Sequence, residues 1–233
     1  MNSRPTALVT GAAKRIGRAI ALDLGRSGWR VGVHYNGSDE AAGETVEQIR
    51  ANGGSAVALQ ADLEDLDAAR GLLPACAEAL AAPRCLVNNA SLFEQDDIST
   101  LNAEGFNRHF RVNLRAPVFL AQAFSEHLPA GEDGVIINIL DQRVWKLTPD
   151  FFSYTVAKSA LWTATRTLAQ GLAPRIRVNA IGPGSIATDM FNTVAANPEK
   201  YRTIMSRTPM GRLGEPSEIA AIAVFLASAE SSY

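Results

Sequence analysis

Tyr154 and Lys158 stand four residues apart, and Asp141 precedes the tyrosine by thirteen residues. Residues four apart on a helix share one face, so the lysine ammonium can lie near the phenol and favour its ionisation. A phenol titrates near ~10, and proton transfer works best when the donor's pKa lies close to the ambient pH. The pair alone is a weak pattern that is common on solvated helix faces. Together with Asp141, which ends the apolar run Val135–Leu140, it predicts a proton-transfer site.

A second group of candidates occupies the segment Thr10–Gly17, where the first strand is expected to join the first helix. Glycine at position 11 permits a tight turn, and glycine at position 17 permits close approach of helix and strand. The exposed N-terminus of the helix offers N–H groups to a pyrophosphate. Such turns are common, and this one lacks the G-x-G-x-x-G form. Two basic residues inside it, Lys14 and Arg15, favour an anion as the ligand.

The end of the second expected strand indicates which nucleotide binds. An NAD site would carry an acid there for the ribose, but this chain reaches no carboxylate before Asp39. Without that acid nothing repels a 2′-phosphate, and nearby polar side chains, with Lys14 or Arg15, could bond to it. The sequence therefore favours NADPH over NADH, and the alternative is a solvated turn of small polar residues. The polar candidates are His34, Asn36 and Ser38.

Short apolar runs alternate with longer amphipathic stretches, which predicts alternating strands and helices. Strands of continuous Val, Ile and Leu character are typical of a parallel sheet that is covered on both faces. We therefore expect an α/β protein with a single domain over residues 1–233, a doubly wound parallel sheet (Rossmann fold) with helices on both faces. Strands are expected near 7–10, 30–34, 56–60, 85–88, 135–140 and 177–181, and helices near 16–27, 40–52, 66–81, 103–127, 153–172 and 217–227.

Composition argues against several functional classes. The 233 residues are 47% hydrophobic and 20% charged, enough to bury a large core. A net charge of −2 gives no reason to expect nucleic acid or an anionic membrane as partner. No apolar run could span a bilayer and no signal peptide precedes the first strand, so a cytoplasmic location is expected. Cys76 and Cys85 fit no metal-binding spacing and are interpreted as buried thiols, so no metal is expected.

Over essentially its whole length the chain resembles the short-chain dehydrogenase/reductases. The resemblance rests on the Thr10–Gly17 turn, Asp62-Leu63, Asn88-Asn89-Ala90, Asn113, Tyr154 with Lys158, Asn179, Pro183-Gly184 and residues 211–216. It implies that Asn113 holds a helix kink and a water leading to Lys158. It also implies a homotetramer, although the family normally continues into a last strand and a Gly-rich tail where this sequence stops. The implied cofactor site comprises Gly11, Lys14, Arg15, Ile16, Gly17, His34, Tyr35, Asn36, Ser38, Asp62, Leu63, Asn89, Ala90, Ser91, Tyr154, Lys158, Pro183, Gly184, Ser185 and Ile186.

The chain departs from that family's pattern at Asp141, where the usual serine donates a hydrogen bond to a substrate carbonyl. An ionised carboxylate only accepts hydrogen bonds, and it would repel the oxyanion that develops when a ketone is reduced. It suits a substrate that presents N–H groups or takes a proton at nitrogen, and a protonated Asp141 could itself supply that proton. The substitution resembles the pteridine reductases and related dihydromonapterin or dihydrofolate reductases. Arg15, Phe93 and His34-Tyr35 agree with that branch.

The resulting hypothesis is an NADPH-dependent reduction of a dihydropterin-like C=N bond, with a small-molecule substrate as the partner. The catalytic candidates are Asp141, Tyr154, Lys158 and Asn113, and the substrate-binding candidates are Arg15, Ser91, Phe93, Asp141, Tyr154, Met190 and Phe191. Phe93 would stack on the flat ring. Residues 186–210 are expected to form a mobile lid, in which Met205 is a further candidate for substrate contact. Two alternatives remain: a generic carbonyl reductase, such as a 3-oxoacyl-thioester reductase, and a dinucleotide-sensing protein without chemistry, against which the retention of Tyr154 and Lys158 speaks.

Overall fold

The computed structural model describes residues 4–189 and 197–232. It contains one sheet of six parallel strands in the order β3-β2-β1-β4-β5-β6. Strand order reverses between β1 and β4, and ligands of such sheets bind beyond the carboxyl ends of the strands at that point. The expected doubly wound parallel sheet is thereby confirmed. The strands are β1 (Thr6–Val9), β2 (Arg30–Tyr35), β3 (Ser55–Gln60), β4 (Cys85–Asn88), β5 (Gly134–Ile139) and β6 (Ile176–Ile181).

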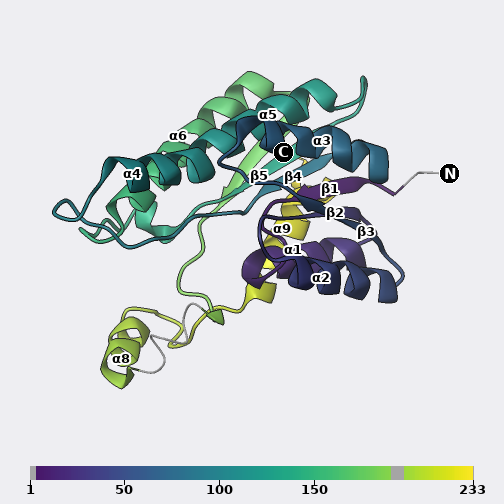
Figure 1. Ribbon diagram of the computed structural model, residues 1–233. Coiled ribbons are helices and arrows are strands. Elements are labelled where there is room, and N and C mark those ends of the chain that lie inside the picture. The colour runs from purple at the N-terminus through teal and green to yellow at the C-terminus, as the bar shows by residue number, and fades with distance from the viewer. Residues whose placement is uncertain (1–3, 190–196, 233) are drawn as a thin grey trace.

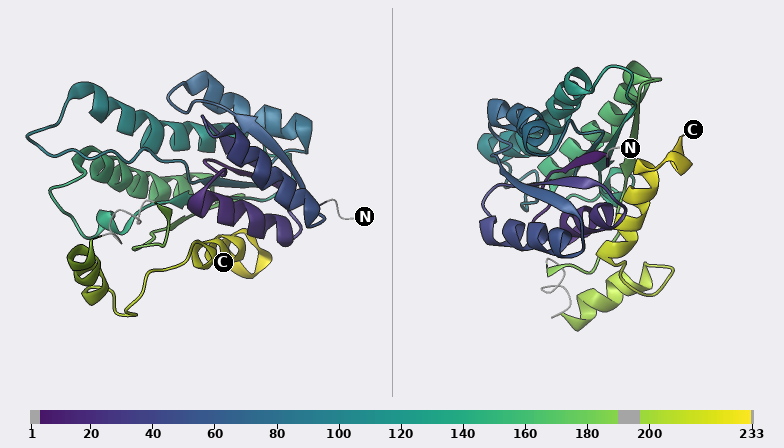
Figure 2. Two further views of the ribbon diagram at one scale, coloured as in Figure 1. Left: turned by 60° about the horizontal axis from the view of Figure 1, so that its bottom comes forward. Right: turned by 90° about the vertical axis from the view of Figure 1, so that its right-hand side faces the viewer.

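Helices cover both faces of the sheet, as Figures 1 and 2 show. Successive strand residues point to opposite faces, so Leu8 and Ile136 join one hydrophobic layer while Val9 and Ile137 join the other. This is why the strands are apolar at consecutive positions. One face carries α1 (Arg15–Arg26), α2 (Asp39–Ala51) and α9 (Pro216–Ala227), and the other carries α3 (Leu66–Ala79), α4 (Ala103–Phe110), α5 (Ala116–His127) and α6 (Phe152–Leu172).

The helix expected over residues 103–127 is interrupted by a π-helical turn, η1 (Arg111–Arg115), between α4 and α5. Pro117, two residues after η1, has no N–H to donate to the carbonyl of residue 113, which disfavours a regular α-helical turn there. The buried side chain of Asn113 lies inside this turn. The resemblance implied a kink at the same place, and the structure shows this irregular turn.

One helix was not expected from the sequence: α8 (Pro198–Ser206) lies inside the proposed lid and stands apart from the sheet in Figure 1. The two ends of the segment are joined by a parallel bridge between Ile186 and Gly214, in which the Gly214 carbonyl accepts from the Ala187 N–H at 2.8 Å. Met190 and Phe191 lie outside the described residues. That this segment closes over a substrate stays a prediction.

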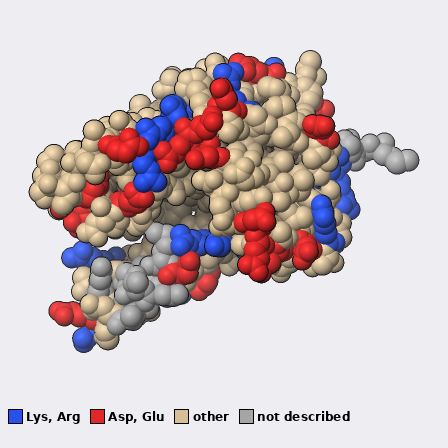
Figure 3. Space-filling model, viewed as in Figure 1, with Lys and Arg blue, Asp and Glu red and all other residues tan. Residues whose placement is uncertain are grey.

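Basic and acidic side chains are intermingled on the face of the molecule shown in Figure 3, and its surface is hollowed near the centre. This agrees with the small net charge of the chain. Among the described residues no helix is both long and apolar enough to cross a membrane. The described part of the chain also contains no cluster of three or more His, Cys, Asp or Glu side chains that could hold a metal ion.

Candidate active site

The side chains of Asp141 and Tyr154 meet beyond the carboxyl end of β5. The Tyr154 hydroxyl donates to Oδ2 of Asp141 at 3.0 Å. Oδ1 accepts from the N–H of Arg143 at 2.8 Å, in the short 3-10 helix η2 (Gln142–Val144), so both carboxylate oxygens are held. Burial, reinforced by the Asp141 charge, raises the pKa of Tyr154 well above its usual value. The phenol is therefore protonated at neutral pH and is available as a proton donor.

Lys158 lies one turn beyond Tyr154 on α6, in the protein interior. Its Nζ donates to the carbonyl oxygen of Ile139 at 2.7 Å and stands 5.7 Å from the centre of the Tyr154 ring. Burial lowers the pKa of Lys158 to about 8. The expected lowering of the Tyr154 pKa by the ammonium is not seen, because burial and the Asp141 charge raise that pKa.

The N-terminus of α6 is fixed by a residue that the sequence did not point out. The Asp96 carboxylate, from the loop after β4, accepts hydrogen bonds from both the N–H of Ser153, at 3.1 Å, and the Ser153 hydroxyl. Its charge also suits the positive end of the helix dipole. No local pattern could have revealed this cap, because 57 residues separate Asp96 from Ser153. The cap holds Tyr154 in the first turn of α6, opposite Asp141.

Phe93 lies in the site as expected, but it is not isolated there. Its ring packs edge-to-face with Tyr154, with centroids 4.7 Å apart and an interplanar angle of 81°. It also stacks on the Phe151 ring, with centroids 4.2 Å apart and an interplanar angle of 5°. One face of Phe93 is therefore covered, and a flat ligand can stack only on the other face or in place of Phe151. Sequence reasoning did not single out Phe151, whose backbone has a left-handed φ of 58°.

Asn113 holds the loop that follows β4. Its Oδ1 accepts from the Leu92 N–H at 2.8 Å and from the Ser91 hydroxyl at 3.1 Å, and its Nδ2 donates to the Leu92 carbonyl at 2.8 Å. These bonds fix the backbone immediately before Phe93. The structure joins Asn113 to this loop, and the water-mediated route from Asn113 to Lys158 stays a prediction.

The turn after β1 is too tight for any residue but glycine at two positions. Gly11 has a φ of +62°, and a Cβ atom there would lie 2.9 Å from Cα of Ala90. A Cβ atom at Gly17 would lie 2.2 Å from the Gly11 carbonyl oxygen. The Asn89 amide ties the end of β4 to this turn by donating to the carbonyls of Thr10 and Gly11, at 2.9 and 3.0 Å.

His34 is placed differently from the sequence expectation. Its side chain is buried, with Nδ1 accepting from the Gly11 N–H at 3.0 Å and Nε2 lying 3.2 Å from the Ala61 carbonyl oxygen, to which it can donate. Burial lowers the pKa of His34 to about 4, so the ring is neutral. Its side chain therefore cannot also bond a 2′-phosphate, because both ring nitrogens are engaged inside the protein. The physical role of His34 is to hold the glycine turn against β2.

The two basic residues of the turn are also separated by the structure. Arg15 forms a two-bond ion pair with Asp189, in which Nη2 donates to Oδ2 at 2.9 Å. Lys14 is exposed and forms no ion pair with any residue in the described ranges. Of the two cations, Lys14 is thus the one available at the turn.

At the end of β2, Asn36 is exposed, Ser38 is half-buried and the Tyr35 hydroxyl donates to Asp39 at 2.6 Å.

The remaining predicted cofactor contacts follow the carboxyl ends of β3, β4 and β6. Asp62 is exposed and accepts from the Glu64 N–H at 2.9 Å, while Leu63 is buried. The Pro183 carbonyl accepts from the Gln142 N–H at 3.1 Å, which ties the segment after β6 to η2. The Trp145 ring covers the residue before Pro183: a Cβ atom on Gly182 would lie 2.5 Å from that ring. Ala90, Ser91, Gly184, Ser185 and Ile186 also stay predicted contacts.

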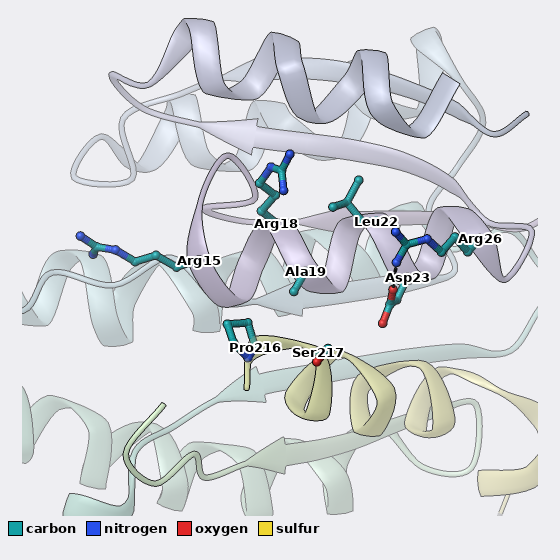
Figure 4. A pocket seen from close by; sticks show the side chains of 8 residues that line it. All are labelled: Arg15, Arg18, Ala19, Leu22, Asp23, Arg26, Pro216 and Ser217. Carbon is teal, nitrogen blue, oxygen red and sulfur yellow. Dashed lines mark hydrogen bonds and ion pairs between the residues drawn. The ribbon is translucent and has the colours of Figure 1, made fainter. Parts of the chain in front are cut away.

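A groove of about 310 Å³ between α1 and α9, seen in Figure 4, is separate from this site. Three arginines line it, but Arg26 pairs with Asp23 at 2.5 Å, Arg18 bonds to Gln48 at 2.7 Å, and Arg15 pairs with Asp189. Neither Tyr154 nor Asp141 contributes to its lining. We therefore assign the chemistry to the crevice at the strand ends and not to this groove.

Comparison with known proteins decides the family. A family model described as enoyl-(acyl carrier protein) reductase matches residues 11–233. The chain is 35% identical to the 3-oxoacyl-[acyl-carrier-protein] reductase of Synechocystis, over 95% of this chain and 88% of that protein. The chain belongs to the short-chain dehydrogenase/reductase family. An uncharacterised oxidoreductase of Methylorubrum extorquens is 40% identical, over 97% of this chain and 92% of its own length.

The crystal structure of FolM alternative dihydrofolate reductase 1 from Brucella canis, complexed with NADP, is also similar to this short-chain reductase. The two chains are 43% identical, with a TM-score of 0.89, and the match covers 99% of this chain and 90% of that one. The protein is thus an oxidoreductase, and NADP is its cofactor, as the sequence predicted.

The residues of this short-chain reductase fit that cofactor. No side chain caps the N-terminus of α1 at Lys14, and the first turn of the helix carries no acid. The free N–H groups and the helix dipole are therefore available to a pyrophosphate. Lys14, Asn36 and Ser38 can approach a 2′-phosphate without a competing carboxylate before Asp39. Among the side chains that the sequence suggested for the 2′-phosphate, His34 is engaged inside the protein, and the contacts of Lys14, Asn36 and Ser38 stay predictions.

Proposed function

We propose that this reductase transfers hydride from NADPH to a C=N bond of a dihydropterin or dihydrofolate-like ring. The observation that carries the proposal is the 3.0 Å hydrogen bond from the Tyr154 hydroxyl to Asp141, which places a carboxylate where the substrate must meet the proton donor. A carboxylate accepts N–H bonds from a pterin ring but cannot donate to a carbonyl while it is ionised. The similarity to a protein named as a dihydrofolate reductase supports the same substrate class.

NADPH, when bound, supplies the hydride for the ring carbon and becomes NADP⁺. Tyr154 delivers its proton to the adjacent nitrogen, so that the C=N bond becomes CH–NH and charge and atoms balance. The raised pKa of Tyr154 keeps the proton on the phenol until the nitrogen becomes more basic. Lys158 then lies 5.7 Å from the ring that carries the phenolate and stabilises it. Asp141, released by the phenol, accepts an N–H of the substrate.

A second candidate is reduction of a 3-oxoacyl thioester, which the similarity to the Synechocystis enzyme favours. The reaction would develop negative charge on a ketone oxygen beside Tyr154. Asp141 opposes that charge, because its carboxylate is fixed next to the phenol and offers no hydrogen. This argument ranks the ketone substrate second.

The replacement Asp141→Ser separates the two candidates. Serine retains a side-chain oxygen that can accept from the Arg143 N–H, so the η2 turn should survive. For a nitrogen-bearing substrate, kcat/KM should fall, because serine can neither hold a negative charge opposite N–H donors nor act as an acid. For a ketone, kcat/KM should rise by up to ~10²-fold, the effect typical of one oxyanion donor.

The measurement is kcat/KM with dihydromonapterin, dihydrofolate and a 3-oxoacyl thioester, for wild type and variant at several pH values. Asp141→Asn serves as a matched control, since it keeps the shape and removes the charge. Loss of both activities in parallel, or a wild type that reduces the ketone and no pterin, would overturn the pterin proposal. The homotetramer implied by the family resemblance is likewise a proposal, and sedimentation equilibrium tests it.

A further inference from the structure

Arg143 lies beside the catalytic carboxylate, and its own partners are neutral. It is half-buried in η2, two residues after Asp141. Its Nη1 donates to the Thr148 hydroxyl at 2.5 Å and lies 3.4 Å from the Asp150 carbonyl oxygen. The guanidinium carbon lies 4.8 Å from the centre of the Phe151 ring. Within the described ranges, no carboxylate forms an ion pair with Arg143.

The opposite edge of the guanidinium is free. Only Nη1 takes part in the side-chain hydrogen bonds, and neither Nε nor Nη2 donates to any described residue. Nε and Nη2 form the edge that binds a carboxylate with two parallel hydrogen bonds. Stacking on Phe151 and the bonds of Nη1 hold the planar group in place, so little rotational freedom remains to be lost when an anion binds.

The same contacts connect this edge to the reaction centre. Arg143 packs on Phe151, Phe151 stacks on Phe93, and Phe93 meets Tyr154 edge-to-face. The positive charge of Arg143 also acts on the Tyr154 phenol, lowering its pKa against the larger effects of burial and Asp141. That influence is smaller than those of burial and Asp141, and Phe151 and Phe93 lie between Arg143 and the phenol in the chain of contacts, so removal of the charge should change turnover little.

We propose that the free edge of Arg143 binds a carboxylate on the side chain of the substrate, so that the reductase prefers a pterin with an anionic tail over one with a neutral tail. The inference rests on the proposed function and deepens it. The flat ring occupies the position beside Tyr154 and Asp141. The tail runs past Phe151 to the guanidinium, which fixes one end of the substrate while the other end reacts.

The test compares dihydrofolate, whose tail carries carboxylates, with dihydromonapterin, whose tail is neutral, as substrates of Arg143→Met. Methionine keeps an unbranched apolar stem against Phe151 and removes the charge. For dihydrofolate, KM should rise about 10- to 100-fold with kcat nearly unchanged, as expected when a charge-assisted bond made equally in ground and transition states is lost. For dihydromonapterin, both constants should stay within about two-fold of wild type.

Two control variants make the result specific. Arg166 also stacks on an aromatic ring, with its guanidinium carbon 5.9 Å from the centre of Trp162, but it lies on the exposed side of α6. Arg166→Met should leave both substrates unaffected. Arg143→Lys should restore part of the affinity for dihydrofolate, because lysine keeps the charge but lacks the two-nitrogen edge.

The possible outcomes separate this inference from the function on which it rests. If the wild type reduces both substrates, and Arg143→Met raises KM equally for both or for neither, the proposed function stands and the role of Arg143 is wrong. A fall in kcat for both substrates would assign Arg143 to the positioning of Asp141 and would also overturn it. If the wild type reduces neither substrate, the proposed function fails and this inference fails with it.

Discussion

Burial and the Asp141 carboxylate act on Tyr154 in the same direction, and together they decide the protonation state of its phenol. Burial and the carboxylate raise the pKa of the phenol, while the lysine Nζ is turned to the Ile139 carbonyl. A tyrosine in this state keeps its proton at neutral pH. It loses that proton only when hydride transfer makes the substrate nitrogen strongly basic, which couples proton transfer to hydride transfer.

Tyr154→Phe tests the role of this proton. Phenylalanine retains the edge-to-face contact with Phe93 and removes only the hydroxyl that bonds Asp141. Turnover should fall by at least ~10²-fold, while the dissociation constant for NADPH should change little. Steady-state kinetics and calorimetric titration of the cofactor measure the two quantities. Near-full turnover in the variant would show that another group supplies the proton.

At the residue scale, the sequence reveals side chains linked by short spacing and misses those linked by the fold. Tyr154 and Lys158 share a helix face, so their proximity could be predicted. Asp96 and Arg143 could not be recognised, because their roles depend on contacts with Ser153 and Phe151 that no sequence pattern encodes. His34 was misassigned for a related reason: a strand covered on both faces gives no signal as to which of its last residues turns inward.

At the scale of elements, the turn between β1 and α1 is built around atoms in contact. Gly11 and Gly17 leave no space for a Cβ atom, and His34 and Asn89 bond the turn from β2 and β4. The backbone that faces the pyrophosphate is thus fixed by two neighbouring strands before cofactor binds. Binding of the cofactor therefore costs less conformational entropy in this segment of the backbone.

Cofactor selectivity depends on this turn and on the end of β2. NADPH should bind more tightly than NADH by several-fold or more, about 1–3 kcal/mol for charge-assisted bonds to the 2′-phosphate. Lys14→Met should reduce the difference in affinity between NADPH and NADH. Lys146→Met, at an exposed position on another loop, should leave that difference unchanged. Calorimetry at moderate salt gives the dissociation constants. Equal affinities of the wild type for the two nucleotides would contradict the prediction.

The positions of most helices and strands could be predicted because hydrophobic periodicity reports burial directly. Two features could not. The π-helical turn η1 depends on Pro117 and on the bonds of Asn113 to the loop at Leu92, which periodicity does not register. The helix α8 is short and mostly exposed, so it carries no strong apolar stripe, and it was expected only as part of an irregular lid.

At the scale of the whole molecule, the buried neutral imidazole of His34 makes the stability of the fold depend on pH. His34 must be neutral to accept from the Gly11 N–H, and burial holds its pKa at about 4, below its usual value of 6.5. Between these two values the unfolded chain binds a proton that the folded chain refuses. The free energy of unfolding should therefore decrease as the pH falls from 6.5 to about 4.

This contribution should amount to about 3 kcal/mol. In His34→Gln the amide can accept from Gly11 and donate to Ala61 without titrating, so the acid dependence should become shallower. His127→Gln, at an exposed position on α5, should keep the wild-type dependence. Urea unfolding at a series of pH values measures the slope. Identical slopes for the wild type and His34→Gln would show that other groups govern acid stability.

Trp145 packs on Gly182, so its intrinsic fluorescence depends on the position of the segment after β6. The Trp145 side chain is 58% exposed, and its ring centroid lies 5.7 Å from that of Trp162. Its ring also lies against Gly182, which precedes Pro183-Gly184. Any ligand that shifts that segment or η2 changes the surroundings of the indole. Intrinsic fluorescence can therefore follow the arrival of cofactor and substrate in real time, without a label and without turnover.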